Sequence, residues 1–162
     1  MYLRYMKIIF VVFIALLCLI IAGQNIANLE AAYQLFVYVM GNADHEAYAS
    51  SFGPSITSPA LLWIALVVVV GSEFVAGFLA AKGAMDMWSA RNASAGSFNQ
   101  AKRYALLGSG LGVIIWLGFF GVIAGTFFQM WQTAIGSASL AGAFQYFVSC
   151  AIVFIIVSMA DE

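Results

Sequence analysis

The chain has 162 residues, of which 64% are hydrophobic and 8% are charged, and its mean hydropathy is +1.00. An ordinary soluble domain carries about 25% charged residues, so this composition excludes that class. The formal net charge of −1 hides an uneven distribution of the six basic residues, and that distribution decides the predicted orientation.

The apolar residues are concentrated in four long runs, at residues 6–22, 60–81, 105–128 and 138–160. Each run has about the 17–25 residues that a membrane-spanning helix needs. We therefore predict an all-α membrane protein, a bundle of four transmembrane helices at approximately 6–28, 60–81, 105–128 and 138–160. The whole of residues 1–162 forms one integral membrane domain in this prediction.

The basic residues all fall on one side of the four-span arrangement. They lie before or at the start of the first span, or between the second and third: Arg4, Lys7, Lys82, Arg91, Lys102 and Arg103. The loops after the first and third spans contain no Lys or Arg. By the positive-inside rule, both the N-terminus and the C-terminus are cytoplasmic. We expect a multi-pass protein of a bacterial inner membrane.

Residues 1–22 have the basic start and apolar middle of a secretory signal peptide. The apolar run is at the long end for that class, and no small-x-small cleavage site is clear. We therefore expect this segment to be retained as the first span.

A second helical pattern follows the first span. Leu29, Tyr33, Phe36 and Met40 recur at three- and four-residue spacing, which predicts an amphipathic helix over residues 29–40. This external helix either continues the first span outward or lies in the outer interface. Gly41 and the polar, Pro-containing residues after it predict a helix stop and an irregular external loop up to residue 58.

The second span contains the residue on which any functional hypothesis depends. Ser58 and Pro59 are suited to the N-cap and first position of a helix. As a helix, residues 60–81 would be roughly 33 Å long, which places Glu73 slightly beyond the middle of the membrane. An ionisable group there costs at least a few kcal/mol unless it is protonated, paired or facing protein.

We expect Glu73 to face the bundle interior or a partner and to be protonated at neutral pH, because no basic residue lies at its depth. Matching of depth between spans places a set of residues near Glu73: Cys18, Ser109, Gly112, Ser149 and Cys150. Ser72, which precedes Glu73 in the same span, is a further possible neighbour. The fourth span is expected to bring Gln145, Ser149 and Cys150 inward. Cys150 and Cys18 are interpreted as small apolar fillers.

Four basic residues flank the link between the second and third spans: Lys82, Arg91, Lys102 and Arg103. They act either as a plain topology signal or as contacts for anionic lipid headgroups. Lys82 and Asp86 are spaced for an i,i+4 ion pair. Residues 92–100, rich in Ala, Ser, Gly and Asn, are predicted to form a short cytoplasmic turn.

Glycines punctuate the third span at helix-packing spacing: Gly108, Gly112, Gly121 and Gly125. Small residues four apart let helix backbones approach closely in lipid, either within the chain or between copies of it. A polar and aromatic cluster is expected at the external ends of the first and third spans: Gln24, Asn25, Asn28, Trp131 and Gln132.

Short motifs along nearly the whole chain resemble a known family. They are Gln24-Asn25-Ile26, Ser58-Pro59, Glu73, Gly83-Ala84, Ser97-Phe98-Asn99 with Ala101-Lys102, Gly112 with Trp116, Phe128 with Met130-Trp131-Gln132, and Asp161-Glu162. The chain resembles the bacterial predicted small integral membrane proteins of unknown function, which have four spans. That family often carries an acidic residue at the position of Thr126. The resemblance implies the fold and the importance of Glu73, and it implies no reaction.

The sequence contains none of the common catalytic or phosphate-binding motifs. Asp44, His45 and Glu46 are adjacent in a polar loop, a spacing that does not converge on one ion without a fold-back. We therefore expect no enzyme, no cofactor, no metal site and no nucleic-acid partner. Three roles remain: an accessory or assembly subunit of a larger membrane complex, a homo-oligomeric proton-coupled carrier using Glu73, or a lipid-binding scaffold using the basic link.

Overall fold

The computed structural model describes residues 2–48, 50 and 52–162. These residues contain helices and no strand. The elements are α1 (Tyr2–Ala27), α2 (Leu29–Met40), α3 (Pro59–Ser89), α4 (Ala95–Ala101), α5 (Arg103–Val113), η1 (Ile114–Phe127), η2 (Met130–Gln132) and α6 (Ala134–Ser158). Four helical segments of this part of the chain are long and apolar enough to cross a membrane, which confirms the predicted fold class.

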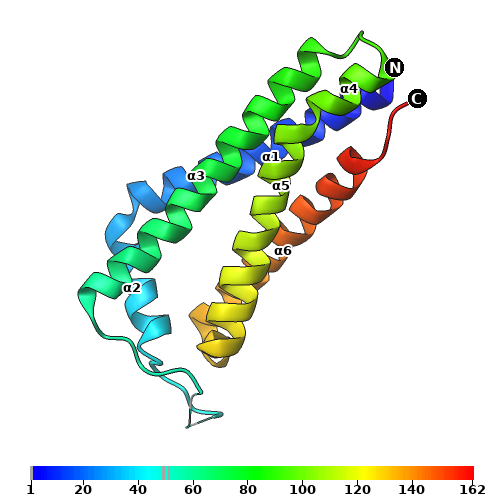
Figure 1. Ribbon diagram of the computed structural model, residues 1–162. Helices are drawn as coiled ribbons and strands as arrows, with labels where there is room; N and C mark the ends of the chain where they lie inside the picture. Colours follow the sequence, from blue (N-terminus) through cyan, green and yellow to red (C-terminus); the bar gives the residue numbers. More distant parts are fainter. Residues whose placement is uncertain (1, 49, 51) are drawn as a thin grey trace.

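Both termini lie at one end of the bundle, beside α4, and α2 with the following loop lies at the other end (Figure 1). An even number of consecutive spans returns the chain to the side on which it began, so four spans place both termini at the same end. The side of the membrane on which each end lies stays a prediction.

The bundle is tightly packed at the end that holds the termini. There α3 lies between α1 and α5, and α6 packs on α5 and η1. Small residues on α3 allow this close packing, because Ala76, Ala80 and Ala84 recur every four residues and are at most 5% exposed. A Cβ on Gly83 would overlap the backbone of Ala105.

The bundle consists of two helix pairs, α1 with α3 and α5–η1 with α6. The two pairs separate toward the end opposite the termini, where α2 lies between them (Figure 1). Only Asn28 separates the end of α1 from the start of α2. α2 packs against α3, and the Tyr33 ring stacks on the Trp63 ring with 4.7 Å between their centroids. Further along α2, Val39 packs with Phe128 and Met130. The predicted helix over residues 29–40 is therefore present with the bounds that the periodicity indicated.

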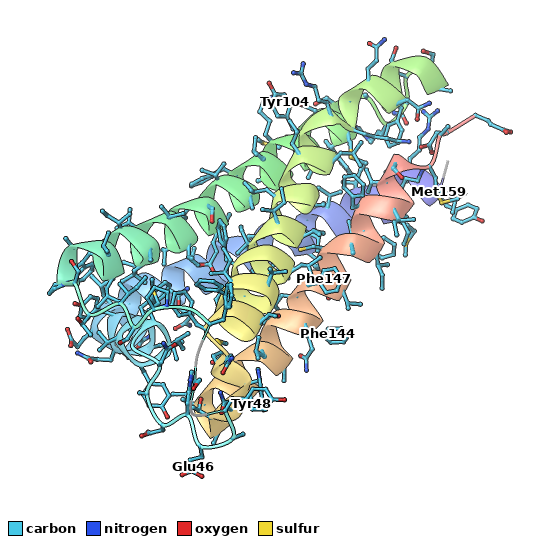
Figure 2. All side chains as sticks on the ribbon, turned by 60° about the horizontal axis from the view of Figure 1, so that its bottom comes forward. Glu46, Tyr48, Tyr104, Phe144, Phe147 and Met159 are labelled. Atoms are coloured by element: carbon cyan, nitrogen blue, oxygen red, sulfur yellow. The ribbon has the colours of Figure 1, made fainter. Side chains whose placement is uncertain are left out.

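The end of α2 and the loop after it also follow the sequence pattern. The helix stops at Met40, and Asn42 adopts a left-handed φ of 54°. Backbone and side-chain hydrogen bonds fasten the loop to this helix end, including Ile56 N to Met40 O at 2.8 Å and Asn42 Nδ2 to Gly53 O at 3.1 Å. Figure 2 shows Glu46 and Tyr48 of this loop at the end opposite Tyr104 and Met159.

Three local predictions need correction. Residues 95–100 of the expected turn belong to the helix α4, and Ser94 caps its first turn by accepting a hydrogen bond from Ser97 N. Ser58 precedes α3 as predicted, but its side chain makes no capping bond. The third span is not a continuous α-helix: η1 is a π-helix of 14 residues that ends with Phe128 N donating to Ile123 O. Apolar periodicity does not distinguish these two helical forms.

Candidate functional site

Glu73 lies on the inner face of α3 and has no exposed surface. Its Oε2 accepts a hydrogen bond of 3.0 Å from Asn25 Nδ2, in the last turn of α1. The predicted inward orientation of Glu73 is therefore seen in the structure. The sequence placed Asn25 in an external polar cluster and missed it as the partner of Glu73, although both residues stand in the family-like motifs.

The second carboxyl oxygen of Glu73, Oε1, is buried and has no hydrogen-bond partner among the described residues. Glu73 lines a partly open cavity of about 410 Å³, together with Asn25, Trp116, Ser139 and Tyr146. Apolar side chains of α2, α3, η1 and α6 complete its wall. Oε1 has no exposed surface, so a donor in the cavity would reach this unpaired acceptor only after the adjoining side chains shift.

No ion pair in the described part of the chain includes Glu73. The carboxyl group is held by the amide of Asn25, and its surroundings are mainly apolar. Leu66 and Val70, which line the same cavity, are at most 5% exposed. Such a group can accept a hydrogen bond or carry a proton without a permanent cation beside it.

Comparison with known proteins shows the family to which the chain belongs. The family model described as "Predicted small integral membrane protein (DUF2165)" matches residues 3–160. The chain belongs to this family. No curated protein matches the chain, and neither does any solved structure. The resemblance drawn from the motifs is thus confirmed, and the family description adds no activity.

The expected neighbours of Glu73 divide into two groups in this member of the family. Ser109 and Cys150 are fully buried, and Gly112 lies against Cys150, so these three belong to the bundle interior. Ser72 is half-buried and bonds its own helix at Val69 O. None of the predicted neighbours lines the Glu73 cavity.

The prediction that Gln145 and Ser149 point inward is wrong. Both are exposed on α6, and the Ser149 hydroxyl donates to the backbone of Gln145. α6 is apolar on nearly all sides, so its sequence pattern carries little information on which face is inward. Its buried face is instead marked by small residues, among them Gly136, Ala143 and Cys150.

Three of the four predicted packing glycines lie at contacts between helices or turns. A Cβ on Gly108 would come within 2.7 Å of Ala76 O, one on Gly112 within 2.7 Å of Cys150 Sγ, and one on Gly125 within 2.9 Å of a Leu140 methyl. Gly121 differs, because a Cβ there would meet only residues 116 and 117 of its own helix. Gly121 thus makes no contact with another helix within the described residues, and packing between copies of the chain stays a prediction for it. The π-helical winding after Val113 changes the face on which later residues lie.

The predicted external polar and aromatic cluster forms separate groups in the structure. Asn25 is turned to Glu73, and Asn28 donates to Gln24 O. Trp131 packs edge-on against Tyr48 at 5.4 Å, and Gln132 Oε1 accepts a 2.7 Å hydrogen bond from Tyr48 N. Trp131 and Gln132 thus fasten the long loop, with Gln129 as a further partner of Gln132.

Lys102 is not a candidate for lipid headgroups, because it is 2% exposed. Lys102 and Lys7 both bind the Asp161 carboxylate, and both donate to Met159 O. Asn99 completes this tail cluster, which consists of Lys7, Asn99, Lys102 and Asp161. The side-chain amide of Asn99 donates a 3.0 Å hydrogen bond to Asp161 O and accepts one of 3.0 Å from Asp161 N.

The charges of the tail cluster alter the acidity of Asp161. Burial by itself raises the pKa of the Asp161 carboxyl, but hydrogen bonds and positive charge from Lys102 and Lys7 outweigh it, so the pKa lies below its ordinary value. The acidic end of the chain therefore acts as a structural counter-ion.

The other basic residues of the link remain nearer the surface. Lys82 forms the predicted i,i+4 pair with Asp86 at 2.9 Å and lies over the Tyr104 ring. Arg91 covers Trp88 and donates to its backbone oxygen. Arg103 is exposed. Its guanidinium lies 5.9 Å from the centroid of the Tyr104 ring, and it forms no ion pair or side-chain hydrogen bond within the described residues, so Arg103 remains the candidate of this set for headgroup contacts.

Proposed function

We propose that this protein is an accessory or assembly subunit of a larger complex in a bacterial inner membrane, with both termini in the cytoplasm. The proposal assigns it no catalytic activity. The observation that supports it most is the exposed position of Gln145 near the middle of α6, on a stripe with Ala141 and Ser149.

An amide exposed at this depth would face hydrocarbon if the chain were alone in the bilayer. The Gln145 side chain makes no hydrogen bond within the described residues, and hydrocarbon offers no partner. A Gln that bonds across to another helix contributes about 0.6–2 kcal/mol in a membrane. Ala141 and Ser149, one turn away on each side, leave room for a second backbone to approach. These features suit the docking of a partner helix on α6.

Recovery of the tagged, full-length protein from native membranes, with a photoreactive residue introduced next to the stripe, tests the proposal. Reproducible cross-links to other membrane proteins are expected. Gln145→Leu should reduce their yield about three- to thirtyfold while the purified protein keeps its helical circular dichroism and its detergent stability. Phe78→Leu, at an exposed apolar position of α3, is the matched control and should have no effect. An unchanged yield of cross-links in Gln145→Leu would contradict the proposal.

A second candidate, the proton-coupled carrier, is favoured by a different observation. The Glu73 carboxyl lines a cavity of about 410 Å³, which is large enough for a small substrate. A carrier predicts that Glu73→Gln assembles normally but loses all transport, because an amide does not titrate. Cross-linking that recovers only copies of this chain would favour this homo-oligomeric carrier over the accessory subunit.

A further inference from the structure

The Glu73 cavity adjoins a second cavity of different character. The second cavity has a volume of about 250 Å³ and lies between α2, α3 and η1. The two cavities share four lining residues: Leu35, Phe36, Val69 and Phe120. They therefore form neighbouring compartments on the side where the two helix pairs separate.

The polar compartment presents a small set of hydrogen-bonding groups. Glu73 Oε1 is an acceptor without a partner, on a side chain with no exposed surface. Tyr146 also lines this compartment, and its hydroxyl makes no hydrogen bond within the described residues. Asn25 holds the other carboxyl oxygen, which fixes the direction of Glu73. One acceptor and one hydroxyl thus have no partner within the described residues, and a small shift of the adjoining side chains would open Oε1 to a ligand in the cavity.

The apolar compartment offers no polar side chain. Its wall consists of aliphatic and aromatic residues, with Val39, Phe128 and Met130 at the far end from Glu73. An alkyl chain that enters from the bilayer loses no hydrogen bond in this compartment and can fill it by van der Waals packing, so alkyl chains suit it. A ligand that fills both compartments must be polar at one end and apolar at the other.

We propose that the two cavities form one site for an uncharged single-chain amphiphile with a hydroxyl head, such as a long-chain alcohol or a monoacylglycerol. The head hydroxyl donates its proton to Glu73 Oε1 and accepts from the Tyr146 hydroxyl. In a protonated Glu73 this arrangement requires the carboxyl proton to be on Oε2, so that Oε1 is the carbonyl oxygen. The alkyl chain lies between α2 and η1. The described lining contains no Lys, Arg or His, so an anionic head would find no counter-charge and would face the Glu73 carboxyl.

The probe for a direct test is dodecanol that carries a diazirine in its alkyl chain, added to the full-length protein in phosphatidylcholine nanodiscs. Mass spectrometry should locate the label on α2, α3 and η1, and unlabelled dodecanol should compete it away. The matching methyl ether, which cannot donate a hydrogen bond, should label about tenfold less at limiting concentration. The ether comparison uses the unmodified protein, so it does not depend on the folding of a variant.

Substitutions then locate the head and the chain of the ligand. Glu73→Leu should reduce the labelling about tenfold, and Ala124→Phe should reduce it by filling the apolar compartment. Ser72→Ala is the matched control, since Ser72 precedes Glu73 but lines neither cavity. Equal labelling by the alcohol and the ether, or label spread over all lipid-facing helices, would show bulk-lipid contact only and overturn the proposal. Stronger labelling by dodecylamine would also overturn it in favour of a cationic head.

Discussion

Asn25 Nδ2 donates a 3.0 Å hydrogen bond to Glu73 Oε2, and this bond joins the end of α1 to the middle of α3. Glu73→Leu removes the acceptor and leaves the Asn25 amide without a partner. The free energy of unfolding in detergent should fall by about 1–3 kcal/mol. Glu73→Gln keeps an oxygen acceptor and should lose much less. A double-mutant cycle with Asn25→Leu should show coupling, and strictly additive losses would contradict the bond's contribution.

Removal of the Asp161 charge should destabilise the protein far more than removal of an exposed acid. Asp161→Asn leaves Lys7 and Lys102 without their carboxylate in a buried setting, where loss of one partner costs about 3–5 kcal/mol. Asp86→Asn, in the exposed pair with Lys82, should cost about 0–1 kcal/mol. Denaturation of the two variants in the same detergent provides the comparison. Equal losses would show that the tail cluster adds nothing beyond a surface pair.

The lowered pKa of Asp161 predicts a particular dependence of stability on pH. A carboxyl whose pKa is lower in the folded state contributes stability above its ordinary pKa of about 3.9. That contribution is lost as the pH falls through the folded-state value. The Asp161-dependent part of the stability should therefore stay level from pH 7 to about pH 5 and decline below about pH 4. Asp161→Asn should lack this part of the decline, and an unchanged acid profile would contradict the assignment.

Two glycines of α3 should respond in opposite ways to the smallest substitution. Gly83→Ala places a methyl group on the backbone of Ala105 and should force α3 and α5 apart. A Cβ on Gly71 meets nothing within 4 Å, so Gly71→Ala should be neutral or stabilise the helix by about 0.5–1 kcal/mol. Thermal unfolding in detergent would measure both. A tolerated Gly83→Ala would show that α3 and α5 pack less closely than described.

The orientation in the membrane can be tested by cysteine labelling at the two ends of the bundle. Ser50→Cys in the long loop should react with an impermeant reagent from outside intact cells, and Ser94→Cys before α4 should not. The native Cys18 and Cys150 are fully buried and should give little background. Labelling of Ser94→Cys from outside would reverse the predicted topology.

Several features of the fold could be predicted because they depend on local properties of the chain. The length of each apolar run predicted the four long helices, since the cost of placing polar groups in hydrocarbon adds up residue by residue. The spacing of Leu29, Tyr33, Phe36 and Met40 predicted α2 because one face of that helix is apolar and the other is not. Glu73 stood out for the same reason, as a charge in an apolar run.

Other features depend on how each helix is rotated against its neighbours. α3 and α6 are apolar on nearly every side, so their patterns do not identify an inner face, and the predicted direction of Gln145 was wrong. The winding of η1 similarly leaves Gly121 without a contact to another helix of the described chain. In such helices, the facing residues are chosen by close packing of small side chains between distant segments.

The sequence by itself determined the membrane class, the four spans, the amphipathic α2 and the membership of the family. Only the tertiary structure decided that Asn25 is the partner of Glu73, 48 residues away. It also decided that Lys102 is buried against Asp161 rather than free for lipid. The physical reason is that hydrophobic transfer acts on each residue separately, whereas a hydrogen bond or ion pair needs two side chains brought together by the packing of whole helices.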